Sequence, residues 1–124
     1  SGRTMSGDAL DAALLTLVPY NIQGFGCNCS IGPDVIANAL APAAPIAKRY
    51  GIPLIAKPNA GMPVTDENGT YFPLTPEDMA AKVDMLTGLG VGIFGGCCGT
   101  TPEYIRKTVE KEMGGKKHDE KREN

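Results

Sequence analysis

Residues 93–102 read Ile93-Phe94-Gly95-Gly96-Cys97-Cys98-Gly99-Thr100-Thr101-Pro102, and the rest of the chain can be interpreted outward from them. Two adjacent cysteines lie among glycines, after an apolar run and just before a helix start. Neighbouring side chains of a regular strand point to opposite faces, so adjacent cysteines would not share a partner there. Glycine reaches positive φ and allows a tight turn that could bring both thiols together. The stretch is therefore typical of two thiolates on one metal ion, of two buried cysteines acting as small hydrophobic residues, or of a rare vicinal disulfide.

The residues on either side of this stretch predict a strand and a helix. Apolar residues 92–94 form the strand, and Thr101-Pro102-Glu103 starts the helix with a capping hydroxyl and a proline in the first turn. We expect Ile105 and Val109 to face inward and Gly114-Gly115 to stop this helix. Residues 114–124 would then be a charged, disordered tail, and its His118 is assigned to that tail rather than to a ligand set.

The preceding chain repeats the same order of strand and helix. A first helix, capped by Ser6 or Asp8, is followed by three strand–helix units. Strands are predicted at 24–29, 53–57 and 92–94. The first helix is predicted at 9–17, and the second at 34–40, with a break or restart at Pro42 and Pro45 before Gly51. The third has a strong start at 75–78 and ends at Gly88 or Gly90. The last runs from 101 to 113. A turn-rich loop without regular structure is expected from Pro58 to about Pro73.

This alternation predicts an α/β fold with parallel strands and crossover helices. The carboxyl ends of such strands carry the functional residues both in open sheets and in (β/α)₈ barrels. Each predicted strand is followed by unusual residues, namely Cys29, Asn59 and the Cys97-Cys98 pair. Three strands cannot close a barrel, which needs eight units and about 250 residues. Barrel sequence of this length would therefore be only the last part of one.

Composition excludes several classes of function. A net charge of −2 over 124 residues gives no basic surface for nucleic acid. The longest mostly apolar stretch, residues 35–47, is interrupted by prolines and is too short to span a bilayer. No charged-then-apolar leader is present, and the grouped cysteines suit a metal in a reducing compartment, so we expect a cytosolic protein. The chain opens with Ser1 rather than Met, which suggests that it begins inside a longer protein.

The four cysteines predict a zinc site with two alternative forms. Cys29, Cys97 and Cys98 follow the first and third strands, where three thiolates would leave one coordination position open, as in catalytic zinc sites. Cys27 would complete a closed structural site with four thiolates, or would be a core residue. We favour the core interpretation, because residues two apart on a strand are separated by about 6.5–7 Å.

Three motifs resemble the homocysteine S-methyltransferase family. They are residues 26–33 (Gly-Cys-Asn-Cys-Ser-Ile-Gly-Pro), 58–63 (Pro-Asn-Ala-Gly-Met-Pro) and 95–102 (Gly-Gly-Cys-Cys-Gly-Thr-Thr-Pro). The chain is most similar to the homocysteine-binding domain of the cobalamin-dependent methionine synthases, in the same order and at similar spacing from Ser1 to about Met113. The resemblance implies that residues 1–113 are the last three strand–helix units of a TIM barrel. The earlier strands, which in the family help to hold the polar end of the amino acid, are absent.

The resemblance also implies a reaction and a site. The family's zinc ligands map onto Cys29, Cys97 and Cys98. Cys27 falls where the family usually has an aliphatic residue. Asn59 matches an asparagine that can occupy the fourth, exchangeable position on the zinc ion. The implied reaction is methyl transfer to the thiol of homocysteine, giving methionine. Methylcobalamin on another module or protein is the expected donor, although relatives that use betaine or S-methylmethionine share the cysteines. The alternatives are a non-catalytic module with four thiolates on zinc, or an inactive barrel fragment.

Overall fold

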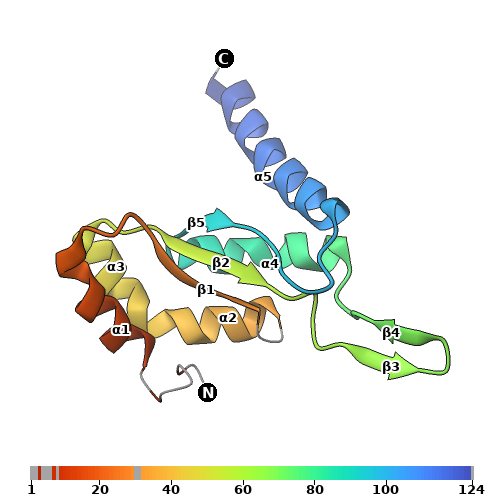
Figure 1. Ribbon diagram of the computed structural model, residues 1–124. Coiled ribbons are helices and arrows are strands. Elements are labelled where there is room, and N and C mark those ends of the chain that lie inside the picture. The colour runs from red at the N-terminus through yellow and green to blue at the C-terminus, as the bar shows by residue number, and fades with distance from the viewer. Residues whose placement is uncertain (1–2, 4–6, 8, 30–31, 124) are drawn as a thin grey trace.

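The computed structural model describes residues 3, 7, 9–29 and 32–123, with side chains up to residue 113. The elements, labelled in Figure 1, are α1 (Leu10–Leu17), η1 (Val18–Tyr20), β1 (Phe25–Cys29), α2 (Pro33–Leu40), η2 (Ala41–Ala43), α3 (Ala44–Tyr50), β2 (Leu54–Pro58), β3 (Val64–Asp66), β4 (Gly69–Tyr71), α4 (Pro76–Gly88), β5 (Val91–Phe94) and α5 (Pro102–Glu123). The three predicted strands and the helices after them are confirmed. The predicted caps Ser6 and Asp8 lie outside the described residues.

The strands β1, β2 and β5 form one parallel sheet in that order. Strand β2 is central, with Phe25 to Cys29 of β1 paired to Leu54 to Pro58 in steps of one residue. On its other side Ile55 pairs with Ile93, after an irregularity beside Leu54. The predicted α/β class with parallel strands is thus confirmed, and the carboxyl ends of all three strands lie at one edge.

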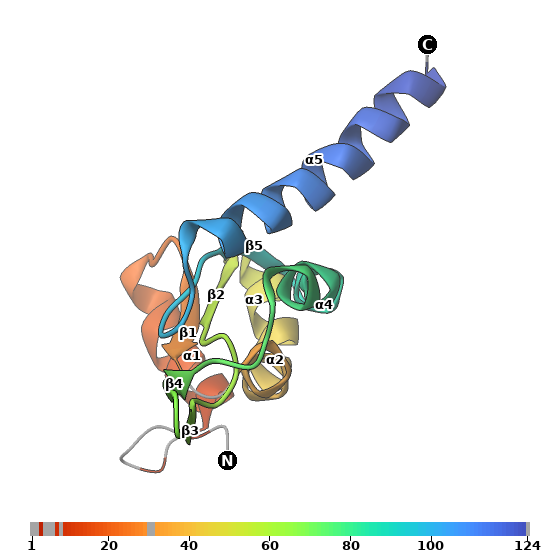
Figure 2. The same cartoon turned by 90° about the vertical axis from the view of Figure 1, so that its right-hand side faces the viewer.

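Helices cover one face of this sheet. Figure 2 shows α2, α3 and α4 together on one side of β1, β2 and β5. The residues of the central strand that point to these helices, Leu54 and Ala56, are fully buried. They join one hydrophobic core with residues from the helices, namely Leu14, Ile36, Ala37, Leu40, Ala43, Ala47 and Leu86. Burying these side chains is the main stabilising contribution of the sheet–helix layer.

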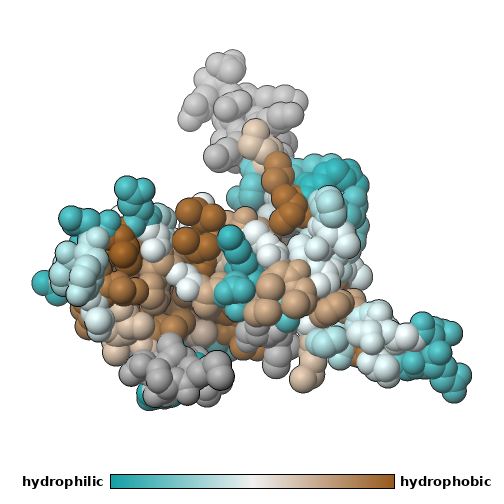
Figure 3. All heavy atoms as spheres, viewed as in Figure 1, coloured by the Kyte–Doolittle hydropathy of each residue, from teal (hydrophilic) through white to brown (hydrophobic). Residues whose placement is uncertain are grey.

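The opposite face of the sheet is uncovered in the described chain. Asn28, Lys57 and Ile93 are exposed there, and the Ile93 side chain has 46% of its surface accessible. Figure 3 views this face and shows hydrophobic atoms exposed across the middle of the molecule. Parallel sheets are almost always covered on both faces, so this face is unusual for a parallel sheet.

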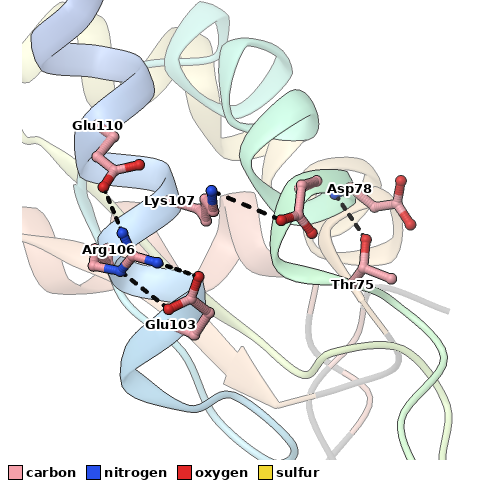
Figure 4. Close-up of polar contacts among 7 residues, drawn as sticks. Thr75, Asp78, Glu103, Arg106, Lys107 and Glu110 are labelled. Carbon is pink, nitrogen blue, oxygen red and sulfur yellow. Dashed lines mark hydrogen bonds and ion pairs between the residues drawn. The ribbon is translucent and has the colours of Figure 1, made fainter.

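Helix α4 begins as the sequence predicts. The Thr75 hydroxyl accepts a hydrogen bond from the Asp78 backbone N–H (3.1 Å), and Pro76 occupies the first turn, where its missing N–H costs nothing (Figure 4). Residues three or four apart then face the core: Met79, Val83 and Leu86 are buried, as expected from their spacing.

Helix α5 differs from the prediction in two ways. It continues through Gly114 and Gly115 to Glu123, because glycine in a helix costs only about 1 kcal/mol and the residues beyond favour helix. Its buried face holds Tyr104 and Thr108, whereas Ile105 and Val109 are exposed. In this orientation α5 forms two ion pairs with α4. Lys111 meets Asp84 at 2.9 Å, and Lys107, shown in Figure 4, lies 3.9 Å from Glu77. No helix in the described part of the chain combines the length and apolar character needed to cross a membrane.

The predicted loop after β2 contains a two-stranded hairpin. Strands β3 and β4 pair antiparallel and extend away from the body of the molecule (Figure 1). The Asp66 carboxylate accepts a hydrogen bond from the Asn68 N–H (2.8 Å), and Gly69 has a φ of 117°. Asn-Gly is a hairpin signal, so the sequence did contain the information for this turn.

Candidate metal centre

The ends of the three parallel strands are held together by backbone hydrogen bonds that continue beyond the sheet. Asn59 N–H donates to Cys29 C=O (3.3 Å), and Cys97 N–H donates to Pro58 C=O (3.1 Å). Ala60 N–H then donates to Cys98 C=O (3.0 Å). The chain after β2 is thus bonded on one side to the end of β1 and on the other to the two-cysteine turn, which fixes the three segments relative to one another.

This arrangement brings three thiols together. The Cys29 Sγ lies 3.2 Å from Cys97 Sγ and 3.9 Å from Cys98 Sγ, and all three sulfurs lie within 4.8 Å of one another. Zinc–sulfur bonds of about 2.3 Å at tetrahedral angles place two sulfurs about 3.8 Å apart. The donor set and its spacing therefore fit one Zn²⁺ ion. They also leave one tetrahedral position without a cysteine.

Cys29 reaches the other two sulfurs from an unusual backbone conformation. Its φ is +68°, in the left-handed region that residues with a side chain seldom adopt. In a regular continuation of β1, Cys29 would lie on the same face as its register partner Pro58, which is fully buried on the helix side. Strained residues of this kind cluster at functional sites.

Two glycines shape the turn that carries Cys97 and Cys98. A Cβ on Gly96 would lie 2.2 Å from the Thr100 side chain, so no other residue fits the turn as built. Gly99 has a φ of +79°, and a Cβ there would lie 2.2 Å from the Phe72 ring. Thr100 N–H donates to Cys97 C=O (3.1 Å) and closes the turn just before α5. The glycines of the motif thus have a steric explanation.

The three thiols influence one another's ionisation. Hydrogen bonds with Cys97 and Cys98 raise the pKa of Cys29 to about 11, because ionising Cys29 would remove its proton from them. The pKa of Cys97 is lowered, since its sulfur accepts hydrogen bonds from the Cys29 thiol and from the Asn28 amide, whose Nδ2 lies 3.8 Å away. Without a cation, Cys97 therefore ionises more readily than Cys29. A bound cation would favour ionisation of all three thiols.

Cys27 lies apart from this cluster. Among the described residues, the group whose ligand atoms could hold a metal consists of Cys29, Cys97 and Cys98. Cys27 is half-buried, packs against the core on the helix side and has a pKa raised by burial. This geometry agrees with the core interpretation of Cys27.

Asn59 lies beside the cluster and is held by it. Its side chain is 8% exposed, and its Oδ1 accepts a hydrogen bond from the Cys98 backbone N–H (2.9 Å). The structure therefore places Asn59 next to the third cysteine. The role of Asn59 as an exchangeable metal ligand stays a prediction. The side chain of His118, which the sequence analysis assigned to the tail, lies outside the described residues.

Comparison with known proteins gives consistent matches. Residues 1–111 match the model of the family described as homocysteine S-methyltransferase. Two relatives named methionine synthase, from Mycobacterium leprae (strain TN) and Mycobacterium tuberculosis (strain ATCC 25618 / H37Rv), are each 35% identical over 110 residues. Each match covers 88% of this chain and 9% of the relative, so the chain spans about a tenth of the length of these relatives.

Proposed function

Because this chain belongs to the homocysteine S-methyltransferase family, we propose that it supplies the zinc-binding part of an enzyme that methylates homocysteine. One observation carries the proposal: three thiols from two strand ends converge at a spacing that fits zinc, and none of them is needed to fill the core. The product of the reaction would be methionine. The methyl group would move from its donor to the sulfur, and the thiol proton would be released.

The residues of this chain would divide the work at the site. Cys29, Cys97 and Cys98 would hold Zn²⁺, which when bound would keep the sulfur of homocysteine in its nucleophilic thiolate form. The Asn28 amide would donate to the Cys97 sulfur and fix its orientation. Asn59 would cover the fourth position with a neutral amide oxygen that substrate can displace. The chain would need to supply no general base, since coordination to zinc would itself lower the pKa of the homocysteine thiol.

The structural alternative, zinc closed by four thiolates, has less support. It needs the Cys27 sulfur at the metal, whereas Cys27 packs into the helix-side core. The uncovered sheet face supports the view that these units belong to a larger (β/α)₈ barrel, whose other strands would cover it. Methylcobalamin on a separate module is the donor we propose, in a cytosolic enzyme whose reducing surroundings keep the thiols free.

The test is methionine formation by the protein in its natural full length. We expect turnover of homocysteine with methylcobalamin, loss of turnover on removing zinc with a chelator, and recovery on adding zinc back. Betaine and S-methylmethionine, offered separately, identify the donor. A full-length protein with bound zinc and no methyl transfer to homocysteine from any of the three donors would contradict the proposal.

A further inference from the structure

The sulfur of Cys97 accepts a hydrogen bond from a residue outside the thiol cluster. The donor is the side-chain amide of Asn28, whose Nδ2 lies 3.8 Å from Cys97 Sγ. In the described part of the chain, the hydrogen bonds to the sulfurs of Cys29 and Cys98 come from other thiols of the cluster. Those bonds need a thiol proton and would be lost if a cation held all three sulfurs as thiolates. The bond from Asn28 would remain, because the amide donates a proton of its own.

The backbone conformation of Cys29 makes this contact possible. Neighbouring side chains of a regular strand point to opposite faces, so Asn28 and Cys29 would not meet the same atom. Here Cys29 Sγ lies 3.2 Å from Cys97 Sγ, and Asn28 reaches that sulfur as well. The left-handed φ of +68° turns the Cys29 side chain toward the same sulfur. An amide oxygen in the place of Nδ2 would repel a thiolate, so the N–H side of the amide faces Cys97 when the thiol is ionised.

Burial does not protect the Cys97 sulfur. Cys97 is partly exposed and lines a hollow of about 570 Å³, whose other lining residues belong to the two-cysteine turn and to the first turns of α5. Cys29 and Cys98 do not line this hollow. A small electrophile that enters it therefore meets Cys97 before the other two cysteines.

A methyl-transfer site that contains several thiolates must favour one of them. Thiolates are nucleophiles, so cysteines that hold a metal compete with the substrate sulfur for the methyl group. A hydrogen bond to a thiolate stabilises its negative charge and must weaken as the sulfur shares its electrons with carbon. It therefore lowers the reactivity of the sulfur that accepts it. An amide suits this task, because it is neutral and does not transfer its proton to the thiolate.

We propose that Asn28 shields the Cys97 sulfur from methylation, so that the methyl group goes to homocysteine; this inference rests on the function proposed above. In the side reaction that Asn28 would suppress, the Cys97 thiolate attacks the methyl carbon. A sulfur–carbon bond forms, and the bond from carbon to the leaving group breaks, with its electron pair staying on the leaving group. The product is a neutral thioether and no longer the thiolate that binds Zn²⁺. Asn28 acts through Cys97 and is therefore a positioning residue.

A purely structural role for Asn28 makes a different prediction. If the amide only held Cys97 in place, its removal would loosen the metal, and all three cysteines would react faster. If it shields the sulfur, zinc is retained and Cys97 alone becomes more reactive. Asn28→Leu has a similar shape without the donor, and Asn28→Gln keeps an amide on a longer side chain. Asn68→Leu makes the matched change at an exposed asparagine of the hairpin and is the control.

The experiment is methylation of the zinc-loaded, full-length protein by methyl iodide in the absence of homocysteine. Peptide mass spectrometry measures the rate at each cysteine, and atomic absorption measures zinc beforehand. In the unmodified protein we expect the exposed Cys98 to be methylated faster than Cys97. In Asn28→Leu the rate at Cys97 should rise about three- to tenfold, the size expected for one lost hydrogen bond, and the rate at Cys98 should stay within twofold.

The other two variants complete the comparison. Asn28→Gln should restore part of the protection, and Asn68→Leu should match the unmodified protein. During turnover with homocysteine and methylcobalamin, Asn28→Leu should start near the normal rate and then lose activity as methylated Cys97 accumulates.

Two results would overturn the role of Asn28. One is an unchanged rate at Cys97 in an Asn28→Leu protein that retains zinc. The other is loss of zinc with equal gains at Cys29, Cys97 and Cys98, which would assign a structural role to the amide. Both leave the proposed function standing, because the unmodified protein would still form methionine. Failure of the unmodified zinc protein to methylate homocysteine would instead overturn the proposed function.

Discussion

Single residues decide whether this edge of the sheet can hold a metal. The thiols of Cys29, Cys97 and Cys98 arrive from two segments almost seventy positions apart, and each is placed by a local departure from regular backbone. For Cys29 the departure is its left-handed φ of +68°. For Cys97 and Cys98 the departure is the tight turn that Gly96 and Gly99 allow. A cation bound by all three would offset the cost of holding these conformations.

The first prediction concerns the ligand set. In the full-length protein, Cys29→Ala, Cys97→Ala and Cys98→Ala should each lose stoichiometric zinc, because two thiolates are left to hold the ion. Cys27→Ala should keep one zinc per chain, since its sulfur packs in the core. Atomic absorption on purified protein measures this directly. Full zinc retention in any of the first three variants would remove that residue from the ligand set.

The second prediction concerns Asn59, whose Oδ1 accepts a hydrogen bond from the Cys98 N–H at 2.9 Å. Asn59→Ala should keep zinc, since the thiolates remain, but should lower the free energy of unfolding by about 1–3 kcal/mol, because the Cys98 N–H loses its partner. In a substrate-free crystal structure of this variant, water should replace the amide oxygen at the fourth position. Asn59→Asp, which keeps an acceptor, is the control for stability. A crystal structure of the unmodified zinc protein with Asn59 turned away from the metal would exclude it as a ligand.

The convergence of these residues could be predicted from the sequence, for a physical reason. Parallel strands present their carboxyl ends at one edge, so residues that follow successive strands must meet there. The left-handed conformation of Cys29 could not be predicted, because cysteine has no preference for it.

At the scale of elements, the turn before α5 and the end of α4 contain glycines with opposite roles. Gly99 has a φ of +79° and no room for a Cβ beside Phe72, whereas Gly88 lies exposed in α4 with nothing within 4 Å of an added Cβ. Gly99 is thus required by the geometry of the turn. Gly88 only weakens its helix.

The third prediction follows from this pair of glycines. Gly99→Ala should destabilise the protein by about 1–3 kcal/mol and lower its zinc affinity, because the turn must shift to accommodate the methyl group. Gly88→Ala should raise the free energy of unfolding by about 0.5–1 kcal/mol and leave zinc binding unchanged. Urea unfolding and competition with a zinc chelator measure the two effects. Equal behaviour of the two variants would show that the turn is not strained as described.

Elements differed in how well the sequence predicted them. Helix α4 was placed correctly, since Thr75 and Pro76 define its start and its apolar residues recur at helical spacing. The hairpin was missed because β3 and β4 have three residues each, and their residues are all exposed, so no alternating hydrophobic pattern marks them. The prediction that Ile105 and Val109 face inward rested on their hydrophobicity alone. Both are exposed in the structure, where α5 contacts α4 through other residues, such as Lys111.

At the scale of the whole molecule, apolar surface remains exposed where a folded domain normally buries it. Ile93 on the open sheet face, and Ile105 and Val109 on α5, are 46%, 36% and 52% exposed. The strands β1 and β5 are sheet edges with one unpaired side each. A parallel sheet with one bare face and two free edges is favoured only when other elements cover it. The (β/α)₈ barrel proposed above would provide such elements.

The last prediction is that the 124 residues alone are poorly stable and catalytically inactive. The helix-side core is retained, so secondary structure should be present by circular dichroism. The bare sheet face should bind a hydrophobic dye and promote association, and heating should produce a broad loss of signal rather than a sharp transition. Zinc should sharpen the transition only partly, since it joins the strand ends and leaves the face uncovered. The full-length protein, measured alongside, should unfold cooperatively and bind little dye. A sharp, concentration-independent calorimetric transition of the isolated monomer would mean that the face needs no further cover, and would remove the main structural support for a larger barrel.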